Sequence, residues 1–161
     1  MKHILEIHLE HKIDVIREIE IPSKKSLKDL HFEIVKSLEL NSKEMAAFYI
    51  TNDQFELLEE IPLFKIDDEN QTTHDMSEIT IESAFPSINT ELIYIYDFLK
   101  MWRFLVCYSK KSHKICEEIK LINTIGKMPN NAPEINFEAN KSEDILNDIE
   151  RNIDNIHDSE Y

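Results

Sequence analysis

The chain contains a single glycine, Gly126, among its 161 residues. Phosphate-cradling loops need several glycines, because only glycine lets successive backbone amides approach a phosphate closely. The sequence therefore excludes a dinucleotide-binding fingerprint, a P-loop and a nucleophile elbow. This shortage alone removes many classes of enzyme.

Cysteine and long apolar runs are scarce as well. Cys107 and Cys116 are the only cysteines, and they lack the C-x-x-C spacing of zinc and redox sites. No apolar run approaches the roughly 18 residues that cross a bilayer. The N-terminus lacks the apolar region of a signal peptide. We therefore expect a cytoplasmic protein without a membrane span, and we expect Cys107 to be a buried thiol.

Basic residues are outnumbered: 18 Lys and Arg stand against 32 Asp and Glu, and the net charge is −14. The acids concentrate in residues 56–91 and 129–161, whereas residues 100–128 hold seven bases and two acids. A net acidic field repels nucleic acid at long range, and affinity for it depends on neutralising phosphates. Nucleic acid is thus disfavoured as a partner, although a local phosphate-binding patch in the basic segment remains an alternative. Its candidate contacts are Lys110, Lys111, Lys114 and Lys120.

The first third of the chain has clear periodicities. Apolar and polar residues alternate in residues 3–9 and again in 15–21, which predicts two strands. Leu and Ile then recur at helical spacing behind Ser26, a good N-cap, and predict a helix over 26–38. Residues 47–51 are a short strand candidate, so the order is strand, strand, helix, strand.

The middle of the chain holds the strongest apolar signal. Residues 92–98 and 102–108 are apolar on both parities, which is typical of strands covered on both faces. We expect them to be central and antiparallel neighbours. Alternation in residues 79–85 and in 119–125 suggests further strands, and the irregular stretch of about 52–91 reads as an acidic insertion.

These patterns predict an α+β fold. It would contain a mixed or antiparallel sheet with a β-grasp-like start, one main helix packed on the sheet, and a C-terminal amphipathic helix. The domain would span residues 1–128, followed by a linker over 129–141 and the last helix over 142–158. That helix must bury one face, either on its own domain or on a partner chain such as a second copy.

A motif in the apolar centre carries a family resemblance. Tyr94, Tyr96, Asp97, Phe98 and Trp102 form the pattern Tyr-x-Tyr-Asp-Phe-x-x-x-Trp. Together with Ile16-Arg17, Leu30-His31 and Ala132-Pro133-Glu134, it resembles the root-inducing-plasmid ORF-three-like family. Members of this bacterial and archaeal family are also described as insertion-element passenger proteins. The resemblance covers about residues 1–135 and implies a small α+β domain, but no established activity.

The chain departs from that family pattern at polar positions. Leu99-Lys100 stands where the family has Gly-Asp, and Phe104 stands where it has histidine after the tryptophan. The family's histidine-rich strand corresponds to residues 44–48, which contain no histidine. If those polar residues serve a metal or catalytic site in relatives, this chain has lost it.

Asp97 is the first candidate for chemistry, since a carboxylate on a buried strand has a raised pKa unless it is paired. It could act as an acid or base. It could also be a structural partner for a buried donor, either Arg17 or backbone amides at the hinge, and the cost of an unpaired buried charge favours this structural interpretation. The structural motif candidates are Arg17, Tyr94, Tyr96, Asp97, Phe98 and Trp102.

Two weaker alternatives remain among these residues and the histidines. The aromatic side chains of the motif could stack single-stranded bases, but their strand spacing favours core. His74-Asp75 in the acidic segment could hold a divalent cation weakly, although the EF-hand spacing is absent. No catalytic, metal or cofactor-binding residue is assigned, and no cofactor is expected.

The favoured function is a non-enzymatic protein-interaction module. Its partner would be a protein, bound by the acidic surface or by the last helix. The last helix could also mediate self-association. The alternative is a nucleic-acid accessory protein linked to mobile elements. A metal-binding or hydrolytic enzyme is the least favoured, because the polar motif positions are lost.

Overall fold

A computed structural model describes residues 1–54, 56–65, 74–115 and 117–130. Within them the chain forms a seven-stranded sheet in the order β4-β3-β5-β6-β1-β2-β7, and every ladder is antiparallel. The strands are β1 (Lys2–Leu9), β2 (Ile16–Pro22), β3 (Ala46–Thr51), β4 (Leu57–Pro62), β5 (Glu91–Tyr96), β6 (Trp102–Ser112) and β7 (Lys120–Ile125).

The β5–β6 hairpin lies at the middle of this sheet, between β3 and β1. Its register places Tyr94 opposite Phe104 and Tyr96 opposite Trp102. The two apolar segments are therefore central antiparallel neighbours, and this expectation is confirmed. β5 is buried on both faces, whereas β6 is buried on one face and half-exposed on the other.

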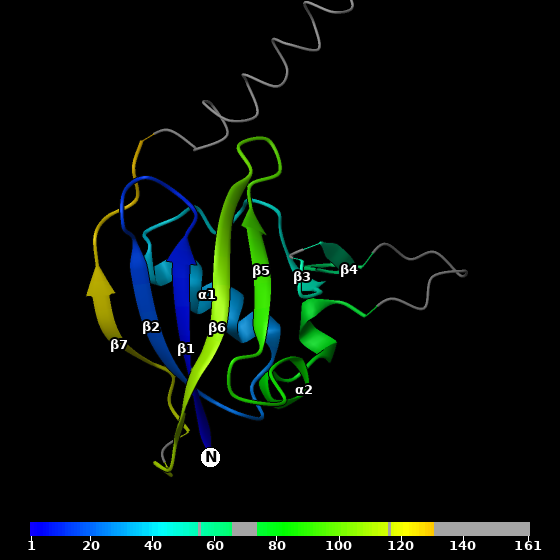
Figure 1. The fold of residues 1–161 in the computed structure, drawn as a ribbon, viewed down its shortest axis with the longest axis vertical. Coiled ribbons are helices and arrows are strands. Elements are labelled where there is room, and N and C mark those ends of the chain that lie inside the picture. The colour runs from blue at the N-terminus through cyan, green and yellow to red at the C-terminus, as the bar shows by residue number, and fades with distance from the viewer. Residues whose placement is uncertain (55, 66–73, 116, 131–161) are drawn as a thin grey trace, which may run out of the picture.

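The helices lie on one face of the sheet (Figure 1). α1 (Leu27–Ser37) begins at a capping box, in which Ser26 and Asp29 each bond the backbone amide of the other. This arrangement satisfies two amides that the first turn leaves without partners. The buried stripe of α1 packs against the sheet, and the 3-10 turn η1 (Met76–Glu78) and the short helix α2 (Ile81–Ala84) complete that layer. None of the described helices is long and apolar enough to cross a membrane.

The core fills the space between the helical layer and one face of the sheet. In the inner strands, residues of one parity are buried there, as the alternation in β1 shows: Leu5, Ile7 and Leu9 are buried, while Ile4, Glu6 and His8 are half-exposed on the other face. The second face of the sheet has no described helix over it (Figure 1).

The expected α+β class is wrong. Strands dominate the described residues, and α1, with 11 residues, is the only described helix longer than four residues. The sheet contains no parallel pair among the described strands, so neither a mixed sheet nor a β-grasp arrangement is present there. Periodicity along the chain overstates the share of helix, because it does not show how many strands pair into one sheet. The expected helix over 142–158 and most of the linker lie outside the described residues.

Two expectations for the acidic segment are also wrong, namely that the stretch of about 52–91 is irregular and that residues 79–85 form a strand. Residues 57–62 are a strand that pairs with β3, although Glu59-Glu60 interrupts the alternation expected of a strand. Residues 79–85 make one isolated bridge, between Thr80 and Ser26, and then turn into α2. A hydroxyl cap from Thr80 onto the Ser83 amide favours the helical turn over an extended strand.

Candidate functional site at the end of the β5–β6 hairpin

Most aromatic side chains of the motif belong to the hydrophobic core. Tyr94, Tyr96, Trp102 and Phe104 are all buried on the helical side of the sheet. The Tyr94 ring packs between Phe48 and Phe104, at centroid distances of 4.8 and 5.8 Å. These four rings are therefore not available to stack on bases in this structure. Only Phe98 of the motif is exposed.

Asp97 begins the turn that joins β5 to β6. Its backbone adopts the left-handed region, with φ of 61°, and its N–H donates to the carbonyl of Met45 at 2.8 Å. Its carboxylate accepts from the N–H groups of Leu99 at 3.1 Å and Lys100 at 3.3 Å. The N–H of Met101, also left-handed at 55°, closes the turn on the Asp97 carbonyl at 2.6 Å. The side chain thus binds backbone amides at the hinge.

Arg17 lies elsewhere and does not contact Asp97. Its Nε donates to the carbonyl of Ser37 at 3.0 Å, and its Nη1 donates to the carbonyls of Ile16 and Ile125, both at 2.9 Å. These bonds tie the end of α1 to β2 and β7. Burial lowers the pKa of the guanidinium, partly offset by Glu39. The arginine of the family motif is therefore a structural clamp in this chain.

The turn that Asp97 organises presents apolar side chains to solvent. Leu99 at its apex is 95% exposed, and Phe98 and Met101 beside it are about two-fifths exposed, at 40% and 44%. Two neighbouring loops add exposed Met45 and Ile13. We call the five side chains together the apolar end: Ile13, Met45, Phe98, Leu99 and Met101.

Hydrogen bonds hold the three loops of the apolar end together. Loop 41–45 is fixed to the turn by the Asp97–Met45 bond and by the Tyr96 hydroxyl, which donates to the carbonyl of Asn41 at 2.6 Å. Loop 10–14 is fixed by the N–H of Glu10, which donates to the carbonyl of Arg103 at 2.9 Å. Figure 1 shows the β5–β6 turn projecting at the end of the sheet opposite the N-terminus.

The apolar end is close to neutral although the chain carries a net charge of −14. Its three loops hold three lysines (Lys12, Lys43 and Lys100) and four carboxylates. One carboxylate belongs to Asp97, which the turn amides occupy. Another belongs to Glu10, which lies 2.9 Å from Arg103 Nε, an ion-pair distance without a well-aligned hydrogen bond. Asp14 and Glu44 supply the remaining negative charge.

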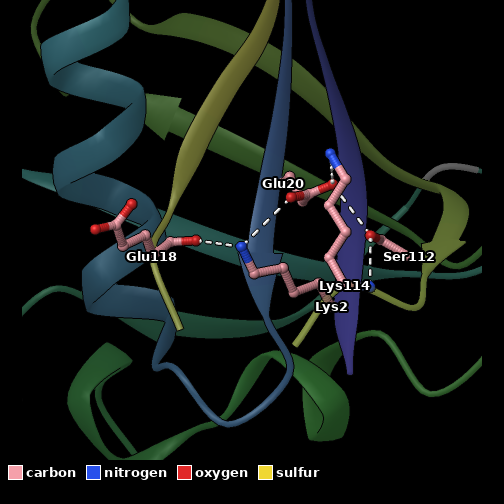
Figure 2. Close-up of polar contacts among 5 residues, drawn as sticks. All are labelled: Lys2, Glu20, Ser112, Lys114 and Glu118. Carbon is pink, nitrogen blue, oxygen red and sulfur yellow. Dashed lines mark hydrogen bonds and ion pairs between the residues drawn. The ribbon is translucent and has the colours of Figure 1, made fainter. Parts of the chain in front are cut away.

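A buried ionic cluster lies at the opposite end of the sheet (Figure 2). Lys2, only 1% exposed, donates to the Glu20 carboxylate at 3.3 Å and to the Glu118 carbonyl at 2.6 Å. Ser112 donates to the other Glu20 oxygen at 3.1 Å, and Lys114 lies 3.8 Å from it. Burial opposes the charge of Glu20, but the bonds from Ser112 and Lys2 outweigh it and lower the pKa of the carboxyl. The cluster anchors the connection between β6 and β7 to β1 and β2.

The four candidate phosphate contacts surround this cluster. Lys110 and Lys111 end β6 and are exposed, while Lys114 and Lys120 lie near Glu20, which pairs with Lys120 across the β2–β7 ladder. Part of their charge is therefore offset by Glu20. The phosphate-binding role of these lysines stays a prediction.

His31 and His74 both have defined partners. His31 is buried, and its Nδ1 lies 2.7 Å from the Tyr94 hydroxyl, while its Nε2 has no partner among the described residues. Burial, with a smaller contribution from Lys28, lowers the pKa of His31 to about 4. His74 in the acidic segment lies 2.7 Å from Glu78. In the described part of the chain, no three His, Cys, Asp or Glu residues are placed to hold a metal.

Sequence reasoning missed the two most distinctive features. Lys2 and Glu20 were not singled out, because charges on alternating strands normally face solvent. The sequence gives little indication of this pair, because Lys2 precedes the alternating pattern of residues 3–9. Only the antiparallel pairing of β1 with β2 brings Lys2 close to Glu20. In the sequence, Leu99 indicates only the loss of a polar family position, whereas in the structure it is almost fully exposed to solvent.

Comparison with known proteins supports the ancestry that the aromatic motif suggested. The model of the plasmid pRiA4b ORF-3-like protein family matches residues 2–134. The chain belongs to that family. A solved structure with a similar fold is that of MM3350, a protein of unknown function from Methanosarcina mazei Go1. It is 18% identical, the match covers 76% of this chain and 68% of that chain, and the TM-score is 0.61. At that identity the similarity concerns the fold alone. No curated protein matches the chain.

Proposed function

We propose that this member of the plasmid pRiA4b ORF-3-like family is a non-enzymatic protein-interaction module and that its contact surface is the apolar end. The observation that carries the proposal is the nearly complete exposure of Leu99 at the apex of an ordered turn. An isolated exposed leucine is ordinary, but five large apolar side chains gathered from three adjoining loops are typical of an interaction site.

The backbone of the turn supports this function. Asp97 and Met101 both hold left-handed conformations without being glycine, and each such conformation costs on the order of 1 kcal/mol. Strain of this kind persists where the surrounding bonds impose it, and it concentrates at functional sites. The hydrogen bonds of Asp97 keep the apex in one shape, so little conformational entropy would be lost when a partner covers Leu99.

The polar groups near this surface favour binding over chemistry. The Asp97 carboxylate is occupied by the amides of Leu99 and Lys100. Tyr96 is occupied by the carbonyl of Asn41, and burial raises the pKa of its hydroxyl further from neutrality. A general acid or base needs a side chain that is free to exchange a proton with a substrate, and both of these side chains are already engaged by the backbone.

Site-specific crosslinking tests the proposal. A photoreactive amino acid would replace Leu99 in one variant and Ile115 in a second. Ile115 is a matched control, because it is 94% exposed but lies between β6 and β7, beside the ionic cluster. Protein adducts that form at position 99 and not at position 115 would support the apolar end as a contact surface. Equal yields at both positions, or no adducts at position 99, would contradict it.

The nucleic-acid alternative rests on the exposed lysines at the other end. Retention on a DNA column, measured as a function of salt, separates it from the proposal, because phosphate contacts weaken steeply as salt rises. Binding at low salt that is lost on replacing Lys110 and Lys111 by glutamine would favour the alternative. An absence of binding at low salt would remove it.

A further inference from the structure

We infer that the partner of the apolar end is a second copy of this chain, held in a closed two-fold dimer. The inference rests on the proposed function, since it names the partner for the same surface.

Charge is the first reason. Two copies with a net charge of −14 each repel one another wherever their acidic surfaces meet. In the three loops of the apolar end the lysines are matched by carboxylates, so a contact between these loops adds little local repulsion, although the net charge of the two copies still opposes their approach at long range. A highly charged partner of either sign would find no large excess of opposite charge within these three loops.

Self-complementarity is the second reason. In a two-fold contact the same patch faces itself, so each residue type must find a suitable partner within that patch. The apolar end supplies Leu99 and its neighbours as an apolar centre. It also supplies exposed Lys100 and Lys43 and the carboxylates of Asp14 and Glu44 around that centre. Lysines of one copy can therefore meet carboxylates of the other at the rim.

The same charges argue against a lipid surface as the occupant. Loops that bind membranes combine apolar side chains with an excess of basic residues, which anionic lipids attract. The loops of the apolar end have no basic excess, and the remaining charge of the chain would be repelled by anionic lipid. Trp102, the single tryptophan, is buried in the core and not placed at this surface.

Light scattering from the purified full-length chain tests the inference. The protein would be measured at about 10 μM and about 1 mM, because association depends on concentration. Wild type and Ile115→Asp should move from the mass of one chain toward that of two. Leu99→Asp should keep the mass of one chain, because two buried leucines are lost, and its dissociation constant should rise at least about 100-fold. Leu99 is almost fully exposed, so this variant should fold as wild type does, which circular dichroism checks.

Three results would overturn the inference. The first is a wild-type mass of one chain at both concentrations. The second is dimerisation of Leu99→Asp equal to that of Ile115→Asp. The third is a mass that grows beyond two chains, which would exclude a closed two-fold contact. A single-chain mass combined with adducts of other proteins at position 99 would overturn the dimer and leave the proposed function standing. A single-chain mass without adducts would overturn both.

Discussion

At the scale of single residues, the scarcity of glycine has a visible consequence. Among the residues that the structure describes, four that are not glycine take left-handed backbone conformations, namely Glu39, Asn89, Asp97 and Met101. Asparagine and aspartate tolerate this region because their short polar side chains bond the local backbone. Asp97 does so through two turn amides. Gly126, at φ of 73°, is used where a Cβ would lie 2.2 Å from the carbonyl oxygen of Asp14.

Replacement of Asp97 measures this local role. Asp97→Ala removes the acceptor of two amides and the tolerance for a left-handed backbone, so the free energy of unfolding should fall by about 1–2 kcal/mol. Asp97→Asn keeps an acceptor oxygen and that tolerance, so its loss should be well under half as large. Urea denaturation of both variants checks the difference. Equal losses would mean that the negative charge, and not the turn geometry, is what the fold uses.

The buried His31 gives the protein a defined sensitivity to acid. Its pKa is about 4 in the fold, below the ordinary value of 6.5, so the unfolded chain takes up a proton first as pH falls. The stability that neutral His31 contributes is therefore present above pH 6.5 and is lost as pH falls toward about 4. The loss should reach roughly 3 kcal/mol, at 1.36 kcal/mol for each unit of difference in pKa.

The variant His31→Gln tests this linkage, since glutamine does not titrate and can still bond the Tyr94 hydroxyl. Unfolding free energies at several pH values between 7 and 4 should decline less steeply for the variant than for wild type. Parallel pH profiles for the two proteins would show that other groups cause the acid sensitivity. His3, whose pKa burial also lowers, is the first of those to examine.

At the scale of elements, the ladders bring together residues that local patterns keep apart. Lys2 and Glu20 come from β1 and β2, and the ion pair between them holds a carbonyl of the β6–β7 connection. β5 and β6 were predictable because their apolar runs are long and apolar on both parities. β4 was not, because its two glutamates break the alternation and only pairing with β3 makes it a strand.

The buried pair should show strong coupling. Lys2→Met leaves the Glu20 carboxylate buried without its main cation, and the free energy of unfolding should fall by about 3–5 kcal/mol. Adding Glu20→Gln removes the uncompensated charge and keeps an acceptor for Ser112, so the double variant should recover most of that loss. Urea denaturation in a double-mutant cycle gives the coupling energy. A single Lys2→Met variant within about 0.5 kcal/mol of wild type would show that the pair does not anchor the sheet.

At the scale of the whole molecule, the apolar end contrasts with the net charge of the chain. The chain is strongly acidic, yet the end that exposes Leu99 is nearly neutral. Long-range repulsion therefore opposes the association of two copies in every orientation. In the proposed dimer, the burial of apolar surface at the apolar end offsets this repulsion.

Salt should strengthen self-association as a result. Raising NaCl from about 0.02 M to about 0.5 M shortens the screening length several-fold and reduces repulsion between the acidic copies. The dimer fraction from light scattering at fixed protein concentration should rise, while Leu99→Asp stays a single chain at both salt levels. A dimer that dissociates as salt rises would indicate that ion pairs between copies, rather than Leu99 and its apolar neighbours, hold it together.

The sequence by itself determined the ancestry, the capped helix and the central hairpin, because these depend on local spacing and on apolar runs that only a covered strand can carry. The tertiary structure decided the number of strands, and with it the correction from an α+β fold to a sheet-dominated one. It also decided which charges are buried and that Leu99 is almost fully exposed. Those outcomes depend on neighbours from distant parts of the chain: β2 and the β6–β7 connection bury Lys2, whereas nothing in the described residues covers Leu99. Periodicity along one segment carries no information about what lies across from it.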